Sequence, residues 1–315
     1  MGQCCANSSD RDHEVYKSSN TTIKNSQGNL NNSRDYNEDL QLSEVENSFE
    51  LQKHGPPPSL AIKIKTLPAH LSAKVEELAR TQPKFEFRND NEIVEKAIFL
   101  GLRQFENHSI YIGQWYNKKR NGRGQQIYPD GSVYEGYWVD DKREGYGRFI
   151  DFMGDVYEGE WKGDNACGKG KYTQKGGPFY YGDWVDNKQN GHGREKWPTT
   201  GETYEGEYKD GFKHGIGTFK VSDGSYYHGQ FAQDKIEGTG EYHWEDGRHY
   251  NGQWKNSERD GRGEFFWPTG VRYIGEYKSN LKEGKGKLFF GNDEYLEGTF
   301  KQNLLVIAIL PRKEK

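Results

Sequence analysis

The first residues of the chain carry groups that could be acylated. The sequence begins Met1-Gly2-Gln3-Cys4-Cys5-Ala6. Once Met1 is removed, the α-amine of Gly2 is the kind of group that accepts a myristoyl chain, and nearby thiols accept palmitate. Ala6 departs from the Ser or Thr favoured at that position. Because one acyl chain binds membranes only marginally, we expect Gly2 to act with Cys4 or Cys5. The alternative is an incidental glycine in a polar tail.

Other residue types used in catalysis or metal binding lack the spacing that such chemistry needs. The nine histidines show no metal-ligand spacing, and Cys167 has no base beside it in the sequence. The G-x-G pairs lack the G-x-G-x-x-G context of a phosphate-binding turn. Glu135, Glu158, Glu205 and Glu297 recur at one position of a repeat, which predicts a solvated ladder. We therefore expect no catalytic residues, no metal, no cofactor and no small-molecule substrate.

Composition excludes several classes of protein. Hydrophobic residues make up only 32%, whereas aromatics reach 14% and glycines number 40, so any core must be built from rings. A net charge of −4 with no basic cluster argues against nucleic-acid binding. The three cysteines are too few for a secreted disulfide scaffold. The longest apolar run, Leu304–Leu310, is shorter than the ~20 residues of a membrane-spanning helix, and no secretory signal is visible.

The aromatic residues recur at a fixed interval, and this interval defines the elements that position them. The pattern Y-x-G-x-W/Y/F steps by 23 residues, with one step of 24, and a G-x-G pair begins eleven residues after each tyrosine. The tyrosines are Tyr111, Tyr134, Tyr157, Tyr180, Tyr204, Tyr227, Tyr250 and Tyr273. The first glycines of the pairs are Gly122, Gly145, Gly168, Gly191, Gly215, Gly238, Gly261 and Gly284. Internal repetition of this kind predicts a repeat architecture.

Each repeat reads as a β-hairpin. Tyr157, Gly159 and Trp161 alternate with charged residues, which is the period of a strand with one apolar face. Turn signals such as Asp210-Gly211 and Pro129-Asp130-Gly131 separate the strands. We expect the glycines to leave slots, meaning bare backbone on a ring-covered face over which a neighbouring ring lies. The alternative is that they serve β-bulges.

A ninth, partial unit ends the array. It begins at Leu296-Glu297-Gly298-Thr299-Phe300 and lacks the G-x-G pair, whose positions fall on Ile307 and Ile309. We expect isoleucine to fill these slots, which would make Leu304–Leu310 a capping strand. A membrane-anchoring segment is the rival interpretation.

The chain before the array divides into two parts. Residues 1–60, rich in Ser, Asn and acidic groups, are expected to form a disordered, acylated tail. Residues 61–110 are expected to form an N-terminal cap on the first hairpin, with a short helix over 70–81 and with Phe85, Phe87, Ile98 and Phe99 contributing. Residues 111–300 form the array of eight full repeats and one partial repeat. Residues 301–315 are the capping strand and a basic tail.

Y-x-G-x-W followed by G-x-G at this spacing resembles the MORN (membrane occupation and recognition nexus) repeat, over residues 111–300. Tyr208, Phe231 and Tyr277 stand where Trp is usual. The resemblance implies an all-β fold: an elongated, single-layer, twisted antiparallel sheet of hairpins with an aromatic groove. Such repeats occur in junctophilins, plant phosphatidylinositol phosphate kinases, SET-domain methyltransferases and radial spoke heads. The segments flanking the array are too short for a kinase or SET domain, so we expect a non-enzymatic repeat protein.

Three functions remain open at this point. The first is a scaffold at the cytoplasmic face of a membrane, tethered by its acylated N-terminus. It would hold a helical or extended protein segment in the aromatic groove, with Trp161, Trp184, Tyr204 and Trp254 as contact residues. The second is a structural component of a cytoskeletal assembly, such as a ciliary axoneme. The third is a phosphoinositide-binding module, which the near-neutral charge of the array favours least.

Overall fold

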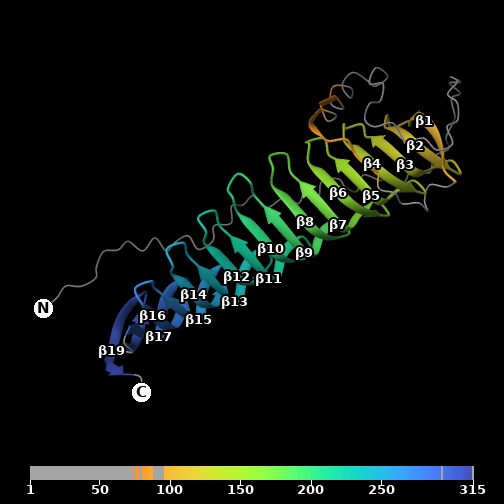
Figure 1. Cartoon of the computed structure of the whole chain (residues 1–315). Helices are drawn as coiled ribbons and strands as arrows, with labels where there is room; N and C mark the ends of the chain where they lie inside the picture. The colour runs from red at the N-terminus through yellow and green to blue at the C-terminus, as the bar shows by residue number, and fades with distance from the viewer. Residues whose placement is uncertain (1–72, 74–75, 78–79, 88–95, 292–293, 314–315) are drawn as a thin grey trace. The chain divides into compact units, whose positions relative to one another are not determined.

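The chain folds as an antiparallel β-sheet in the computed structural model, which describes residues 73, 76–77, 80–87, 96–291 and 294–313. Nineteen strands follow one another in these described ranges, and consecutive strands pair antiparallel (Figure 1). The predicted all-β hairpin sheet is confirmed. The chain divides within β9 into two compact units, one ending at Gly191 and the other beginning at His192, and each is described by itself.

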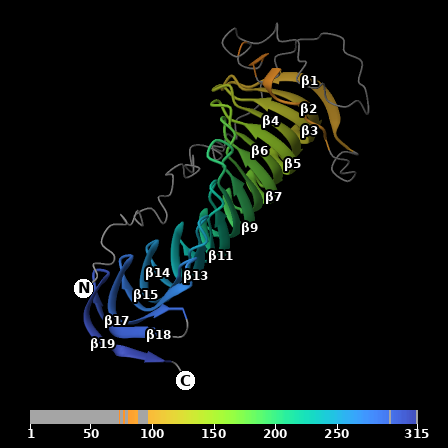
Figure 2. The ribbon, with the colours of Figure 1, turned by 60° about the vertical axis from the view of Figure 1, so that its left-hand side comes forward.

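The strands are short and regularly spaced, and they lie in chain order within each unit in both views (Figures 1 and 2). The bounds up to the division are β1 Ile98–Gln104, β2 Ile110–Tyr116, β3 Lys119–Ile127, β4 Val133–Val139, β5 Lys142–Ile150, β6 Val156–Lys162, β7 Asn165–Thr173, β8 Phe179–Val185 and β9 Lys188–Lys196. The remaining strands are β10 Thr203–Lys209, β11 Phe212–Lys220, β12 Tyr226–Ala232, β13 Lys235–His243, β14 His249–Lys255, β15 Glu258–Phe266, β16 Val271–Lys278, β17 Leu281–Phe290, β18 Glu294–Lys301 and β19 Leu304–Lys313.

A two-residue turn closes the hairpin of each repeat. Both turn residues have positive φ, as in Asp140 (47°) and Asp141 (71°) or Asn256 (51°) and Ser257 (66°). This is the conformation of a type I′ turn, whose twist matches that of the flanking strands. Asn, Asp and Gly tolerate positive φ best, which explains why polar turn residues recur at this place in the sequence.

The glycines of each repeat serve two different purposes. A Cβ built on Gly229 or Gly240 would overlap the ring of Tyr227, and the same holds for the corresponding glycines of the other full repeats in which they are described. These glycines form slots, but the ring that fills each slot belongs to the same hairpin and not to a neighbouring one. The first glycine of each G-x-G pair instead has positive φ, as at Gly238 (72°), where the register between β12 and β13 shifts. The bulge interpretation is therefore correct for that position.

Rings packed edge to face form the core. Each repeat tyrosine contacts the aromatic residue four positions later, and most also contact the equivalent ring of the next repeat. Tyr227, for example, lies 5.2 Å from Phe231 and 5.5 Å from Trp254, with interplanar angles of 86° and 82°. Edge-to-face pairs add about 0.5–1.5 kcal/mol to the burial of their area. This packing explains how a chain poor in aliphatic residues forms a core.

The cap region differs from the expectation in two respects. Ile98–Gln104 form an additional strand, β1, which pairs with β2, and Phe99 packs on a small aliphatic cluster that includes Ile110 and Ile127. Phe85 and Phe87 contact tyrosine rings of the second repeat, and Phe87 also contacts Arg123 of the first. Within the range 70–81, the residues that the structure describes are helical: Ala73, Glu76, Glu77, Arg80 and Thr81. The other residues of that range, and the tail 1–60, lie outside the described residues.

The last strand has a different register from the expected one. Ala308, not Ile309, stands opposite Gly298, and the Leu305 side chain reaches the space above Gly298 that a tyrosine ring occupies in the full repeats. Ile307 is 62% exposed. The partial unit begins with Leu296 in place of tyrosine, so a side chain from β19 takes over the role of the missing ring.

Candidate functional site

The four residues predicted to line a partner groove are part of the packed core. Trp161, Trp184, Tyr204 and Trp254 are 2%, 6%, 0% and 3% exposed. The indole Nε1 groups of Trp161, Trp184 and Trp254 each donate a hydrogen bond to a glycine carbonyl of the preceding repeat, at 3.0–3.1 Å. Because packing already uses these rings, they leave little surface for a partner, and a binding surface must be sought on other residues.

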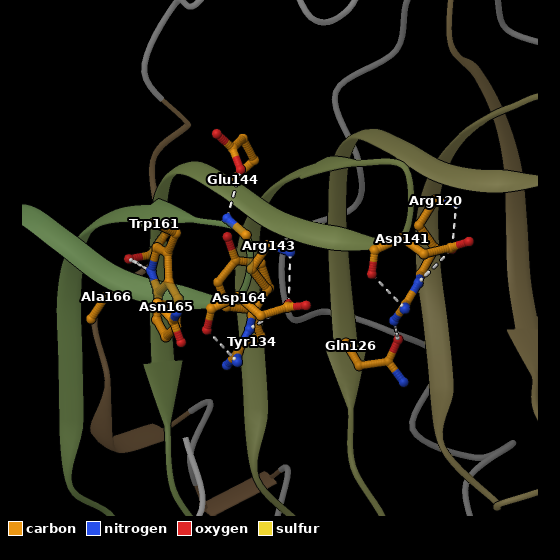
Figure 3. A network of polar contacts seen from close by, with 12 residues as sticks. Arg120, Gln126, Tyr134, Asp141, Arg143, Glu144, Trp161, Asp164, Asn165 and Ala166 are labelled. Carbon is orange, nitrogen blue, oxygen red and sulfur yellow. Dashed lines mark hydrogen bonds and ion pairs between the residues drawn. The ribbon is translucent and has the colours of Figure 1, made fainter. Parts of the chain in front are cut away.

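A row of polar contacts joins the hairpin turns of successive repeats (Figure 3). The second turn residue donates its backbone N–H to a carbonyl of the preceding hairpin, and its side chain accepts the N–H of that same residue in return. Asp164 N donates to Arg143 O at 3.1 Å, and Arg143 N donates to Asp164 Oδ1 at 2.9 Å. Arg120 and Asp141 make the same pair of bonds. We call these reciprocal bonds the turn ladder, and they recur at Ala166/Asn187, Lys213/Asp234, Ile236/Ser257, Arg259/Asn280 and Lys282/Asn303.

Cations buried among the rings strengthen the turn ladder. The Arg143 guanidinium lies 4.3 Å from the Trp161 ring centroid, and its Nε is 3.1 Å from Asp164 Oδ1 (Figure 3). Arg259 and Lys213 occupy the same position in later repeats and are 3% and 8% exposed. Cation–π contacts gain strength when they are shielded from water. These cations were not predicted from the sequence, although a basic residue stands nine positions after most repeat tyrosines.

The opposite face of the sheet carries a row of exposed and half-buried polar side chains. From β10 to β15 the cross-strand neighbours follow one another without interruption, as the registers of these strands show. Within this row Thr218 Oγ1 lies 2.9 Å from His228 Nδ1, and Asn251 Nδ2 donates to Glu241 Oε1 at 2.8 Å. We call this row the polar ladder; its members are Glu205, Thr218, His228, Glu241, Asn251 and Glu264.

One glutamate expected to be solvated is buried. Glu135 is 5% exposed, and its Oε2 lies 2.5 Å from Arg148 Nη2. Burial raises the pKa of Glu135, and the neighbouring Arg148 guanidinium opposes that rise. Glu205 is exposed, whereas Glu158 and Glu297 are half-buried. The expectation of a uniformly solvated ladder is therefore wrong at Glu135, because residues of the cap region cover this part of the face.

Groups that could carry other chemistry are dispersed. Cys167 is a free thiol, and burial together with nearby Glu160 raises its pKa, which disfavours the reactive thiolate. No group of three or more His, Cys, Asp or Glu side chains within the described ranges is placed to hold a metal ion. Nor do those ranges contain a helix of the length and hydropathy needed to cross a bilayer. Gly2, Cys4 and Cys5 lie outside the described residues.

The hairpin geometry and the repeat spacing agree with a family of known sequences. The model of the MORN repeat matches eight consecutive segments: 111–133, 134–156, 157–177, 180–201, 204–226, 227–247, 250–272 and 273–294. The chain belongs to the MORN repeat family. MORN repeats are typically non-catalytic modules, and they suggest a protein-interaction or scaffold role. Proteins that contain them are often associated with membranes.

Other comparisons add little to this MORN assignment. No curated protein matches the chain. Among solved structures, the TCP domain of SAS-4 from Drosophila melanogaster, in complex with a proline-rich motif of Ana2, is 11% identical with a TM-score of 0.33, covering 56% of this chain and 90% of that one. A streptogramin B lyase is 11% identical with a TM-score of 0.15, covering 73% and 87%. Virginiamycin B lyase from Staphylococcus aureus is 14% identical with a TM-score of 0.14, covering 73% of each chain.

Proposed function

We propose that this MORN protein is a non-enzymatic scaffold that holds a protein partner at the cytoplasmic face of a membrane. One observation carries the partner-binding part of the proposal. The repeat tyrosines and the rings four positions after them are used in packing within the sheet, whereas four members of the polar ladder, Glu205, His228, Glu241 and Asn251, are exposed on the opposite face. The surface offered to a partner is therefore a row of side chains held at the regular spacing of the strands.

The polar ladder defines the chemistry of a suitable partner. Its exposed carboxylates, Glu205 and Glu241, lie among hydrogen-bonding groups of Thr218, His228 and Asn251. Six strands at ~4.8 Å spacing give a row of roughly 24 Å, which about seven residues of extended chain would span. A segment with basic and amide side chains complements this row better than an apolar helix does.

The membrane part of the proposal depends on the N-terminal sequence. Gly2 followed by Cys4 and Cys5 supplies both acylation signals that stable anchoring requires. The acyl chains would fix the tail to the bilayer, and the array would then meet its partner at a high local concentration.

Fractionation of cells that express the full chain tests the tether. We expect the wild-type protein in the membrane fraction and released by detergent, and we expect Gly2→Ala to move it to the soluble fraction. Asn7→Ala, a change in the same tail outside the acylation signal, serves as the matched control and should behave as wild type. Retention of Gly2→Ala in a detergent-resistant pellet would contradict the tether and favour the cytoskeletal alternative.

A further inference from the structure

The cap region places a short segment of the chain across the second repeat. Residues 83–87 have no regular secondary structure, and they lie on the face of the sheet opposite the repeat tyrosines. The Phe85 ring stacks on the Tyr146 ring, with centroids 6.0 Å apart and an interplanar angle of 13°. The Phe87 ring meets the Tyr137 ring edge to face at 5.7 Å. Phe85 and Phe87 contact each other at 5.0 Å. We call Pro83–Phe87 the strap.

Two arginines complete the surface under the strap. The Arg148 guanidinium lies 5.4 Å from the Phe85 ring centroid, and the Arg123 guanidinium lies 5.7 Å from the Phe87 ring centroid. Arg148 Nη1 also donates a hydrogen bond to the Pro83 carbonyl at 2.8 Å. Each phenylalanine of the strap is therefore held between a tyrosine and an arginine, and the backbone is held by one charged donor.

The two tyrosines of this surface occur together in one full repeat only. Tyr137 and Tyr146 stand at the fourth and thirteenth positions of the second repeat. The third repeat has Glu160 and Lys169 at these positions. Polar or charged residues also fill the fourth position of the later full repeats, namely Asp183, Glu207, Gln230, Gln253 and Glu276. Two tyrosines that coincide with the two phenylalanines of the strap indicate a site shaped for an aromatic-x-aromatic segment.

The buried ion pair beneath the strap leaves one charged donor that requires an acceptor. Arg148 and Glu135 have side chains that are only 2% and 6% exposed, and they are 2.5 Å apart. The pair uses Nε and Nη2 of Arg148, so that Nη1 is satisfied by the Pro83 carbonyl. A buried charged donor left without an acceptor is costly. The site therefore recognises a backbone carbonyl as well as two rings.

The strap is held by side chains and not by strand pairing. Among the described contacts, one hydrogen bond joins residues 83–87 to the sheet, from Arg148 to Pro83. Pro83, Lys84 and Glu86 are exposed. The strap can thus leave the sheet without breaking hydrogen bonds between strands. Phe85 and Phe87 are two residues apart, and residues at this spacing in an extended segment project to the same side.

We propose that the second repeat carries a docking site for an extended aromatic-x-aromatic segment, and that Phe85 and Phe87 occupy it as an internal ligand that a partner with the same pattern displaces. An internal ligand competes at an effective concentration in the millimolar range, so the site is strongly inhibited in the isolated chain. The inference goes beyond the tethered scaffold and does not depend on acylation. Its failure would leave the fractionation result unaffected.

Peptide binding to the purified full chain tests this proposal. The probe is a fluorescein-labelled peptide with the sequence of residues 81–87, followed by fluorescence anisotropy. The site is vacated in a Phe85→Ala/Phe87→Ala chain, which we expect to bind the peptide at least tenfold more tightly than wild type does. Adding Tyr146→Lys, which installs the residue type of Lys169 in the next repeat, should lower that affinity at least tenfold. A peptide with both phenylalanines replaced by alanine is the control and should not bind.

A second measurement covers the case in which the double variant does not fold, as judged by circular dichroism. A spin label at the exposed position 86, introduced by Glu86→Cys with Cys4, Cys5 and Cys167 replaced by Ser, reports the mobility of the strap in a chain with both phenylalanines intact. Saturating unlabelled peptide should produce a mobile component in the spectrum. The proposal is overturned if the peptide fails to bind the folded double variant at millimolar concentration, if Tyr146→Lys leaves binding unchanged, or if the spin label stays immobile.

Discussion

At the scale of single residues, the repeat tyrosine explains why glycine recurs where it does. In all eight full repeats its hydroxyl donates to the carbonyl three residues later, at 2.9–3.2 Å. The ring is thereby laid flat over two glycines that face each other across the hairpin, such as Gly229 and Gly240. Each repeat tyrosine thus packs within its own hairpin, and it also makes edge-to-face contacts with the aromatic residues four positions after the repeat tyrosines.

Gly240→Ala tests this arrangement. The added methyl group would overlap the Tyr227 ring, which cannot move without losing its contacts with Phe231 and Trp254. We expect a loss of about 1–3 kcal/mol, as for other overpacked sites, seen as a lower urea midpoint. Thr239→Ala, at the adjacent exposed position, is the control and should change stability by less than about 0.5 kcal/mol. Equal midpoints for the two variants would contradict the slot.

Buried tyrosines also predict alkaline unfolding. Burial raises the pKa of Tyr242 and of Tyr273 to about 12, and it raises the pKa values of Tyr111, Tyr134 and Tyr227 as well. Since the unfolded phenol titrates near pH 10, this contribution to stability is complete below pH 10 and is lost as pH rises toward 12. The 295 nm absorbance of these tyrosinates should therefore appear together with the loss of circular dichroism. Full tyrosinate absorbance with retained β-sheet signal would show that the rings are accessible.

At the scale of elements, the turn ladder links most hairpins to the next one. The acceptor is Asp or Asn in most repeats, at 2.7–2.9 Å from the N–H it binds. In one repeat it is Ser257, whose hydroxyl lies 3.2 Å from the Ile236 N–H. Ser257 also has a φ of 66°, which favours Asn over Ser.

Ser257→Asn should therefore stabilise the chain. A longer side chain that tolerates positive φ and accepts at a shorter distance should contribute about 0.5–1 kcal/mol and raise the melting temperature. Ser257→Ala removes the acceptor and should lower the melting temperature by a comparable amount. The matched pair is measured by differential scanning calorimetry on the full chain. A lower melting temperature for Ser257→Asn would count against the turn ladder as a stabilising element.

The elements were predictable from the sequence because their signals are local. The alternation around Tyr157 and the turn at Asp210-Gly211 each depend on a few neighbouring residues, and a constant repeat length fixes the rest. The sequence could not tell the glycines that lie under a tyrosine ring from the glycines that form a β-bulge. Both kinds recur once per repeat at fixed positions. That Trp161 and Trp254 pack inward, leaving the polar ladder outside, depends on the rings of neighbouring hairpins, which periodicity does not report.

Long-range contacts were the least predictable part. The strap reaches Tyr146 and Arg148 over about sixty residues of sequence, and no repeat signal marks that pairing. The exceptional tyrosines at positions 137 and 146 were visible as departures from the repeat, but without a structure they had no assigned contact. Departures from a repeat are therefore where a MORN chain carries information about its individual function.

At the scale of the whole molecule, the residues proposed to attach the chain to a membrane are different from those proposed to bind a partner. In the proposed function the N-terminal residues would supply the membrane attachment; the strap contacts the second repeat, and the polar ladder carries exposed side chains. In repeat proteins each unit contacts its neighbours only, so a substitution on the exposed face should alter binding without unfolding the array. Recognition on the polar ladder is thus testable apart from stability.

Site-specific photo-crosslinking in cells tests the central claim most directly. A benzoylphenylalanine at position 205 or 228 replaces an exposed member of the polar ladder, and one at position 246 replaces exposed Asp246 in a loop outside it. We expect a discrete protein adduct from the photo-crosslinker at position 205 or 228. The adduct should be absent when the photo-crosslinker is at position 246, and it should disappear when Glu241→Lys is added. Adducts from Asp246 alone, or none from either ladder position, would contradict the claim that the polar ladder binds the partner.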